Sequence, residues 1–381
     1  MKKSIFIAVT IVLIAVIIIA FLQLEKKNKQ YIIGSIMPLS GDVATYGVAI
    51  KQGIELAIEQ INYNGGINNK LISVIYEDSK AEPKEGVTVF EKLISVNNVD
   101  IIIGAVASSV TLAIAPIAEK SQTILFSAAS SSPKISNAGD FIFRNYPSDD
   151  LEGKIVAEYA YDNGYVNAAI LTINNDYGIG LNTVFEKEYI ELGGKITLND
   201  KYNEGETNFF PILTKIQENE PQCIFIVGYG KDLGLLVKQA INLGIKSQFF
   251  STVNFYDERS ITSGGTAVEG VIFSSPVFDS ESENENILKF VKTFKSKFGK
   301  KPDVWSAHSY DATLIIADAI SRTGNFNVNE IKNEIYLIKN FNGVSGLTTF
   351  DKNGDVMKEA KFLTVKKGKF IPLEINNAKT N

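Results

Sequence analysis

From Tyr31 onward, apolar runs of about four to six residues alternate with amphipathic stretches of about ten to twenty residues. The short runs predict buried strands, and the longer stretches predict helices. The expected strands cover 32–37, 71–76, 101–103, 123–126, 168–172, 195–198, 223–227, 247–250 and 271–274. The expected helices lie near 44–63, 83–96, 110–120, 151–162, 178–192, 208–217, 232–242 and 284–298. Because strands and helices alternate, the pattern predicts an α/β fold in which parallel sheets are flanked by helices on both faces.

The alternation occurs in two successive blocks, which predicts a two-lobed molecule. The first block ends near 147, and the second begins with a helix after Ser148 and continues to about 276. The pattern then becomes helical, near 284–298, 304–322 and 327–338, and closes with strands near 347–350, 360–365 and 370–373. The simplest division assigns 31–147 plus 277–345 to lobe 1 and 148–276 plus 346–375 to lobe 2, with crossings near 148, 276 and 345. A chain of 381 residues is long enough to build two such cores.

Residues 1–30 differ in kind from the rest of the chain. Lys2 and Lys3 precede the apolar stretch 5–24, in which Thr10 and Gln23 are the only polar residues. A helix of this length spans about 30 Å, the thickness of the hydrocarbon core of a membrane. No small-x-small cleavage site follows, so we expect an uncleaved signal anchor; a cleaved signal peptide is the alternative. Either arrangement places the body outside the cytoplasm, in the periplasm or on the outer face of the cell membrane.

Composition excludes several kinds of function. The net charge of −5 argues against nucleic acid as a partner, because phosphate binding needs a basic face. The chain has one cysteine, Cys223, and one histidine, His308, so neither an internal disulfide nor a Cys/His zinc site can form. Cys223 begins the apolar run 223–227, which predicts a buried thiol. We expect no cofactor and no metal.

Hydroxyl side chains gather in two consecutive strand-to-helix loops of the first block. Ser108 and Ser109 follow the strand expected at 101–103, and Ser130 and Ser131 follow the next strand along. A single serine at such a place is explained by capping of the helix. Runs of serines in neighbouring loops favour a pocket instead, because loops at the carboxyl ends of parallel strands share one edge of the sheet. Helix N-termini at that edge suit a carboxylate.

The second block offers facing groups. Tyr177 follows the strand expected at 168–172, and Tyr229 follows the strand at 223–227. Each tyrosine can provide an apolar wall with a polar tip. Asp149 lies at the first expected crossing, where its carboxylate either faces the cleft as a partner for an ammonium group or caps the following helix.

Several short motifs occur together in one order. They are Met37-Pro-Leu-Ser-Gly41 with Tyr46-Gly47, Ile61-Asn-Tyr-Asn-Gly-Gly-Ile67, Tyr76-Glu-Asp-Ser79, Ile103-Gly104 with Ser108-Ser109, Asp176-Tyr177-Gly178 and Tyr310-Asp311-Ala312. With these motifs the chain resembles, from 31 to about 370, the type I periplasmic substrate-binding proteins of ABC importers, in the leucine/isoleucine/valine branch. The resemblance implies a two-lobed clamshell with three hinge crossings that closes on a small solute. It also implies delivery to an ABC permease with its ATPase subunits, by a monomer.

The resemblance further implies a role for each site residue. Ser108 would bind the ligand carboxylate, and the Ser130 carbonyl and the Ser131 hydroxyl would hold the ammonium. Tyr46 and Tyr177 would flank the ligand side chain, and Asp149 would lie at the amino-group end. The complete set of expected ligand-binding residues is Ser108, Ser109, Ser130, Ser131, Tyr46, Asp149, Tyr177, Tyr229 and Val253.

One position departs from the family pattern. Amino-acid binders of this family often carry a glutamate in the loop after the strand matched by 247–250, and this chain has Ser251-Thr252-Val253-Asn254 there. A missing carboxylate removes a charge-assisted hydrogen bond. The ligand is therefore expected to be an amino acid, branched-chain or related, or an amide-like solute or a carboxylate that lacks the amine.

Two alternatives remain at the level of sequence. The first is a ligand-binding sensory ectodomain of the same fold, in which the chain reports ligand to a partner instead of delivering it. The second is a serine acyl-transfer enzyme of the penicillin-recognising type, since Ser131-Ser-Pro-Lys134, Ser282-Glu-Asn284 and Arg322-Thr-Gly324 resemble its three motifs. Against the enzyme, Ile135-Ser-Asn-Ala-Gly139 is a poor helix former, whereas that chemistry needs the first motif to open a core helix.

Overall fold

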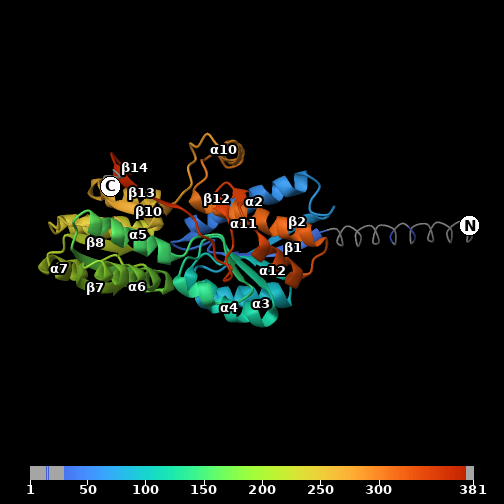
Figure 1. The fold of residues 1–381 in the computed structure, drawn as a ribbon, viewed down its shortest axis with the longest axis horizontal. Helices are drawn as coiled ribbons and strands as arrows, with labels where there is room; N and C mark the ends of the chain where they lie inside the picture. Colours follow the sequence, from blue (N-terminus) through green and yellow to red (C-terminus); the bar gives the residue numbers. More distant parts are fainter. Residues whose placement is uncertain (1–13, 15, 17–29, 375–381) are drawn as a thin grey trace, which may run out of the picture.

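The computed structural model describes residues 14, 16 and 30–374. Residues 30–374 form two lobes arranged along the long axis of the molecule (Figure 1). The sheet of lobe 1 has the order β2-β1-β3-β4-β5, and all of its pairings are parallel. Its strands are β1 (Gln30–Met37), β2 (Leu71–Asp78), β3 (Ile101–Ile103), β4 (Ile124–Ser127) and β5 (Ile142–Arg144). The helices of this lobe are α2 (Ala44–Tyr63), α3 (Pro83–Ser95), α4 (Ser108–Ser121), α10 (Glu285–Phe298), α11 (Val304–Thr323) and α12 (Val328–Leu337), with the 3-10 helix η1 (Pro133–Asn137).

Lobe 2 contains a seven-stranded sheet of order β14-β13-β10-β9-β8-β6-β7. Its strands are β6 (Asn167–Ile173), β7 (Lys195–Tyr202), β8 (Cys223–Val227), β9 (Gln248–Ser251), β10 (Ile272–Pro276), β13 (Ala360–Lys366) and β14 (Lys369–Pro372). Its helices are α5 (Asp149–Asp162), α6 (Asp176–Glu191), α7 (Phe210–Glu218), α8 (Gly230–Asn242) and α9 (Glu258–Gly264), with the 3-10 helices η2 (Val253–Phe255) and η3 (Gly265–Val268).

The expectation of parallel sheets is correct for lobe 1 but incomplete for lobe 2. There β13 pairs with β10 antiparallel, and β14 pairs with β13 antiparallel. The two residues that join β13 to β14, Lys367 and Gly368, both have positive φ, of 53° and 65°. Positive φ at both central residues is the mark of a type I′ hairpin turn, which forces its two strands to run antiparallel.

Each lobe has its own hydrophobic core. In lobe 1, α2 packs so closely on α11 that a β-carbon at Gly53 would lie 2.2 Å from the Ser306 carbonyl oxygen, so only glycine fits there. In lobe 2, Phe185 of α6 stacks on Phe225 of β8 with ring centroids 4.2 Å apart. The two cores can therefore move relative to each other without being disrupted.

The third crossing lies later in the chain than the sequence indicated. Residues after 345 still belong to lobe 1: Phe350 and Val356 lie in its core, and Asp355 pairs with the buried Arg144 at 2.6 Å. The chain enters lobe 2 only at β13. The strand expected near 347–350 instead forms a small hairpin of β11 (Phe341–Gly343) with β12 (Gly346–Thr348). The segment that carries Asp355 stays with lobe 1 because the buried Arg144 guanidinium needs a carboxylate partner, and Asp355 provides it.

Nearly all of the stretch 5–24, for which the sequence predicts a membrane anchor, falls outside the described residues. In the part of the chain that the structure does describe, no helix combines the length and the apolar character that a membrane crossing requires.

Candidate ligand-binding site

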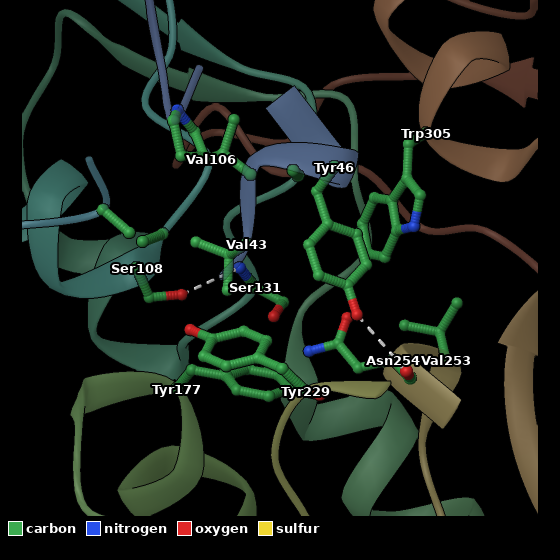
Figure 2. Close-up of a pocket in the computed structure, with 14 residues that line it drawn as sticks. Val43, Tyr46, Val106, Ser108, Ser131, Tyr177, Tyr229, Val253, Asn254 and Trp305 are labelled. Atoms are coloured by element: carbon green, nitrogen blue, oxygen red, sulfur yellow. Dashed lines mark hydrogen bonds between the residues drawn. The ribbon is translucent and has the colours of Figure 1, made fainter. Parts of the chain in front are cut away.

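A cavity lies between the two lobes, and both contribute to its walls (Figure 2). The space between these walls that is free of protein atoms is about 480 Å³, a figure that includes open solvent at its edge. Lobe 1 contributes Pro38, Val43, Tyr46, Ala81, Val106, Ala107, Ser108, Ala129, Ser131 and Trp305, and lobe 2 contributes Tyr177, Tyr229, Val253 and Asn254. Six of the nine residues expected to bind ligand therefore line the cavity, namely Tyr46, Ser108, Ser131, Tyr177, Tyr229 and Val253.

Ser108 is the first residue of α4, and its hydroxyl is held by the neighbouring loop. The oxygen accepts hydrogen bonds from the backbone N–H groups of Ser131 and Ser132, both at 3.2 Å, and the first of these is drawn in Figure 2. A hydroxyl has two acceptor sites and one proton. Because both acceptor sites are used, the proton remains available as a donor to a group in the cavity. The first N–H groups of α4 add positive character at the same point, so this end of the cavity suits a carboxylate.

Ser130 and Ser109 are not part of the cavity wall. The Ser130 hydroxyl is buried, lies 2.7 Å from the Thr111 hydroxyl and donates to the Ala105 carbonyl at 2.9 Å. These bonds tie the two serine-rich loops together. Ser109 follows Ser108 in α4 and is half-buried outside the cavity. A ligand contact through the Ser130 carbonyl stays a prediction.

Aromatic rings form much of the remaining wall. Tyr177 and Tyr229 stack with centroids 6.2 Å apart and planes 17° from parallel, as Figure 2 shows. Across the cavity Tyr46 meets Trp305 edge to face at 5.5 Å. The sequence did not identify Trp305 as a site residue, although it is the only tryptophan of the chain. Apolar rings on both sides favour a ligand with an apolar side chain.

Several contacts hold the lobes together across the cavity mouth. The Tyr46 hydroxyl accepts a hydrogen bond from the Gly230 N–H at 3.3 Å and donates to the Asn254 carbonyl at 3.4 Å. The Arg259 guanidinium lies 5.5 Å above the Tyr46 ring and donates to the Asp42 carbonyl. Burial raises the pKa of Tyr46 well above its usual value, which keeps its hydroxyl protonated. The lobes are thus in contact around the cavity, as expected of a closed clamshell.

Asp149 lies behind the cavity wall and not in it. Its side chain is fully buried, and its backbone N–H donates to the Ser131 carbonyl at 2.8 Å. The capping alternative is wrong, because Ser148 caps α5 by accepting from the Asp150 N–H. Neither carboxylate oxygen of Asp149 makes a hydrogen bond of ordinary geometry within the described residues, although the nearby Ser131 hydroxyl acts to lower its pKa. Burial and the neighbouring Glu152 together raise the Asp149 pKa well above the usual value.

Glu152 is a second acidic residue that the sequence analysis missed. It is 6% exposed, and its Oε1 accepts from the Val253 N–H at 3.0 Å and from the Ser274 hydroxyl at 2.6 Å. Burial raises the pKa of Glu152 to about 7, although the two hydrogen bonds act in the opposite direction. The sequence offered one signal for Glu152: it lies three residues after Asp149 in a predicted helix, and residues three apart share one face of a helix.

The geometry does not support the acyl-transfer interpretation. Ser131 precedes a short 3-10 helix instead of opening a core helix, and Lys134 Nζ binds Asp176 Oδ1 at 2.8 Å. Arg322 pairs with Asp318 within α11 and does not lie on a strand. Among the residues that the structure describes, no cluster of His, Cys, Asp or Glu is suited to hold a metal ion.

Two sheet-based lobes, three crossings and a shared cavity define a two-lobed solute-binding protein. A family of proteins described as periplasmic binding proteins matches residues 30–369, and the chain belongs to this family.

Named relatives extend this result. The chain is 29% identical to Leu/Ile/Val-binding protein homolog 1 of Brucella abortus, over 85% of this chain and 87% of that protein. It is 28% identical to the leucine-, isoleucine-, valine-, threonine- and alanine-binding protein of Pseudomonas aeruginosa, over 84% of this chain and 85% of that one.

Solved structures agree with this fold. The leucine binding protein LivK of Thermotoga maritima superposes with a TM-score of 0.85 at 31% identity, covering 90% of this chain and 97% of that one. LivJ of Streptococcus pneumoniae, a branched-chain amino acid transporter substrate-binding protein in complex with isoleucine, gives a TM-score of 0.83 at 28% identity, covering 90% of this chain and 98% of that one. A Rhodopseudomonas palustris solute-binding protein in complex with benzoate has the same fold. Its TM-score is 0.82 at 20% identity, and the match covers 90% of this chain and 95% of that one.

Proposed function

We propose that this protein is the extracytoplasmic solute-binding component of an ABC importer, and that it captures a branched-chain or related amino acid between its lobes. The observation that carries the proposal is the Ser108 hydroxyl. Its proton is left available for a ligand, it lies at the start of α4 in lobe 1, and it shares the cavity with two aromatic rings from each lobe. A polar donor on one side and apolar rings on the other match a carboxylate with an aliphatic side chain.

Each part of an amino acid would find a matching surface. The carboxylate would bind Ser108 and the α4 N-terminus, and the aliphatic side chain would lie among Tyr46, Tyr177 and Trp305. The ammonium group would lie toward Ser131, whose carbonyl is bonded to the Asp149 N–H. Closure of the lobes would bury the ligand, and the ligand would favour the closed state through contacts that only that state offers.

Delivery to a membrane permease with its ATPase subunits is the role that the named relatives support. The chain would act as a monomer, attached to the outer face of the membrane through 5–24 if that stretch is retained. Ligand capture is common to delivery and to sensing. Vesicles reconstituted with the permease and ATPases would separate the two, because delivery predicts uptake of leucine that depends on this protein.

A thermal-shift screen of the purified protein tests ligand capture. The panel is leucine, isoleucine, valine, leucinamide, benzoate and a polyamine. A ligand at 100 times its Kd stabilises the folded state by about 2.7 kcal/mol, which raises the melting temperature measurably. We expect shifts from the branched-chain amino acids. A shift from benzoate or the polyamine alone, with none from any amino acid, would contradict the proposal.

A further inference from the structure

Arg144 is completely buried at the end of β5, and all five N–H donors of its guanidinium have an acceptor. Its Nε and Nη2 donate to the two carboxylate oxygens of Asp355, at 2.6 and 2.8 Å. Its Nη1 donates to the carbonyls of Ser131 and Ser132, at 2.9 and 3.0 Å. Its Nη2 also donates to the Ser136 hydroxyl at 2.7 Å. A guanidinium with every donor paired is held in one orientation, because any rotation would break several bonds at once.

The loop that carries Asp355 is itself held rigidly against β5. The Asp351 N–H donates to the Asp355 carbonyl at 2.9 Å, and the Asp351 carboxylate accepts from the Asp355 N–H at 3.0 Å. The Arg144 N–H donates to the Gly354 carbonyl at 3.0 Å. This loop belongs to lobe 1 and precedes the third crossing, after which the chain forms β13. The carboxylate that orients the guanidinium is therefore supplied by the segment next to a crossing.

The peptide unit between Ser131 and Ser132 connects Arg144 to the cavity. Its carbonyl oxygen, which belongs to Ser131, accepts from the guanidinium, and its N–H, which belongs to Ser132, donates to the Ser108 hydroxyl at 3.2 Å. A donor that binds the carbonyl of a peptide unit polarises it and strengthens the hydrogen bond made by its N–H. A charged donor has the larger effect. The guanidinium therefore acts on Ser108, although Arg144 itself is not among the residues that line the cavity.

We propose that Arg144 and Asp355 are positioning residues for ligand binding. They hold the Ser131–Ser132 peptide unit in the orientation in which the Ser108 hydroxyl accepts from its N–H, so that the hydroxyl proton is directed to the ligand carboxylate. This inference rests on the proposed function and deepens it, because it places part of the control of the site in the loop before the third crossing. It requires only that the ligand carry a carboxylate.

The test is a double-mutant cycle measured by isothermal titration calorimetry with leucine and with 4-methylpentanoate, a carboxylate of similar shape that lacks the amine. Asp355→Asn keeps the shape of the side chain but replaces one of the two acceptor oxygens by an NH₂ group, which cannot accept from the guanidinium. Ser108→Ala removes the hydroxyl on which the positioning residues act. Asp318→Asn is the matched control, because Asp318 pairs with Arg322 at 2.7 Å in lobe 1 and lies outside the cavity wall.

We expect Asp355→Asn to weaken binding of both probes by about 3- to 10-fold, the range for one hydrogen bond. In the Ser108→Ala background the same substitution should change the affinity by less than about twofold, because the effects of residues that act through one another do not add. A purely structural Asp355 would weaken binding by the same factor in both backgrounds, and that result would overturn the inference. Asp318→Asn should bind as the wild type does.

Ser136→Ala applies the same cycle with a smaller disturbance, and it decides the question if Asp355→Asn does not fold. Ser136 is partly exposed, and its loss frees one guanidinium donor without removing a charge. We expect leucine binding about threefold weaker, with the loss absent in the Ser108→Ala background. No loss in either background, or an equal loss in both, overturns the inference.

The two probes separate this inference from the proposed function. Leucine binding by the wild type together with additive effects in the cycle contradicts the inference alone. Coupled losses for 4-methylpentanoate in a protein that does not bind leucine support the inference and contradict capture of an amino acid. A wild-type protein that binds neither carboxylate overturns both.

Discussion

The hydroxyl of Tyr46 in lobe 1 accepts a hydrogen bond from the backbone N–H of Gly230 in lobe 2, at 3.3 Å. A β-carbon at Gly230 would lie 2.5 Å from the Asp257 side chain, so glycine is what allows the start of α8 to pack this closely on Asp257 within lobe 2. The contact joins the two lobes directly beside the candidate ligand site, which makes it a measure of closure.

Tyr46→Phe should favour the open arrangement. The variant removes the bonds to Gly230 and Asn254 but keeps the ring against Trp305. Each lost bond contributes about 0.5–1.5 kcal/mol, so the two together contribute about 1–3 kcal/mol and leucine affinity should fall by roughly 5- to 150-fold. Small-angle scattering should show a larger radius of gyration in the presence of leucine than for the wild type. The control is Tyr159→Phe, because Tyr159 packs on Phe362 within lobe 2. Equal leucine affinity and equal radius of gyration in the two variants would refute this role of Tyr46.

Ser108→Ala should weaken binding of any carboxylate ligand. The hydroxyl proton is the group left free to donate into the cavity, and its loss should cost about 1–3 kcal/mol, or roughly 5- to 150-fold in Kd. Calorimetry with leucine provides the measurement. Ser109→Ala, one residue further along the same helix and outside the cavity wall, should bind as the wild type does. An unchanged Kd in Ser108→Ala would remove Ser108 from the ligand contacts.

His308 should remain neutral across the physiological range. It is fully buried beside Tyr146, its Nδ1 lies 2.7 Å from the Asn145 carbonyl oxygen, and burial lowers its pKa to about 3. Because the folded pKa lies below the unfolded value of about 6.5, its contribution to stability is present above pH 6.5 and is lost as pH falls toward 3. As the only histidine, it gives one imidazole Hε1 resonance in the untagged protein. A titration of that resonance between pH 8 and 5 would contradict the burial.

Cys223 should be unreactive in the folded protein. It lies in the middle of the lobe 2 core, and burial raises the pKa of its thiol to about 12. The thiolate is the reactive species, so labelling at pH 8 by an aromatic disulfide reagent should be at least about 1,000-fold slower than in urea. The rate of labelling then reports the opening of lobe 2. Rapid labelling without denaturant would show that this core is open in solution.

The positions of the elements were largely predictable because they depend on local periodicity. The helix expected at 44–63 and the strands at 101–103 and 223–227 coincide with α2, β3 and β8. The sequence pattern did not predict β5 and α9. Both elements are too short to show a clear periodicity, and their conformation depends on the elements packed against them. Local pattern could not assign Asp355 to lobe 1, because that depends on its pairing with Arg144, 211 residues away.

The candidate site was predictable to the extent that it follows strand ends. Ser108 and Ser131 reach one cavity because their loops leave adjacent parallel strands, β3 and β4, at the same edge. Trp305 reaches it through the packing of α11 on α2, and Glu152 lies behind it through contacts with Val253 and Ser274. Sequence spacing carries no information on those contacts.

The sequence by itself therefore determined the fold class, the two-block order and the hydroxyl-rich loops, since each depends on periodicity or on the end of a strand. Only the tertiary structure decided where the third crossing lies, that the Ser108 hydroxyl proton remains available to a ligand, and that Asp149 and Glu152 are buried together at the start of α5. Those features depend on contacts between segments far apart in the chain, where burial removes the water that would otherwise satisfy each charge.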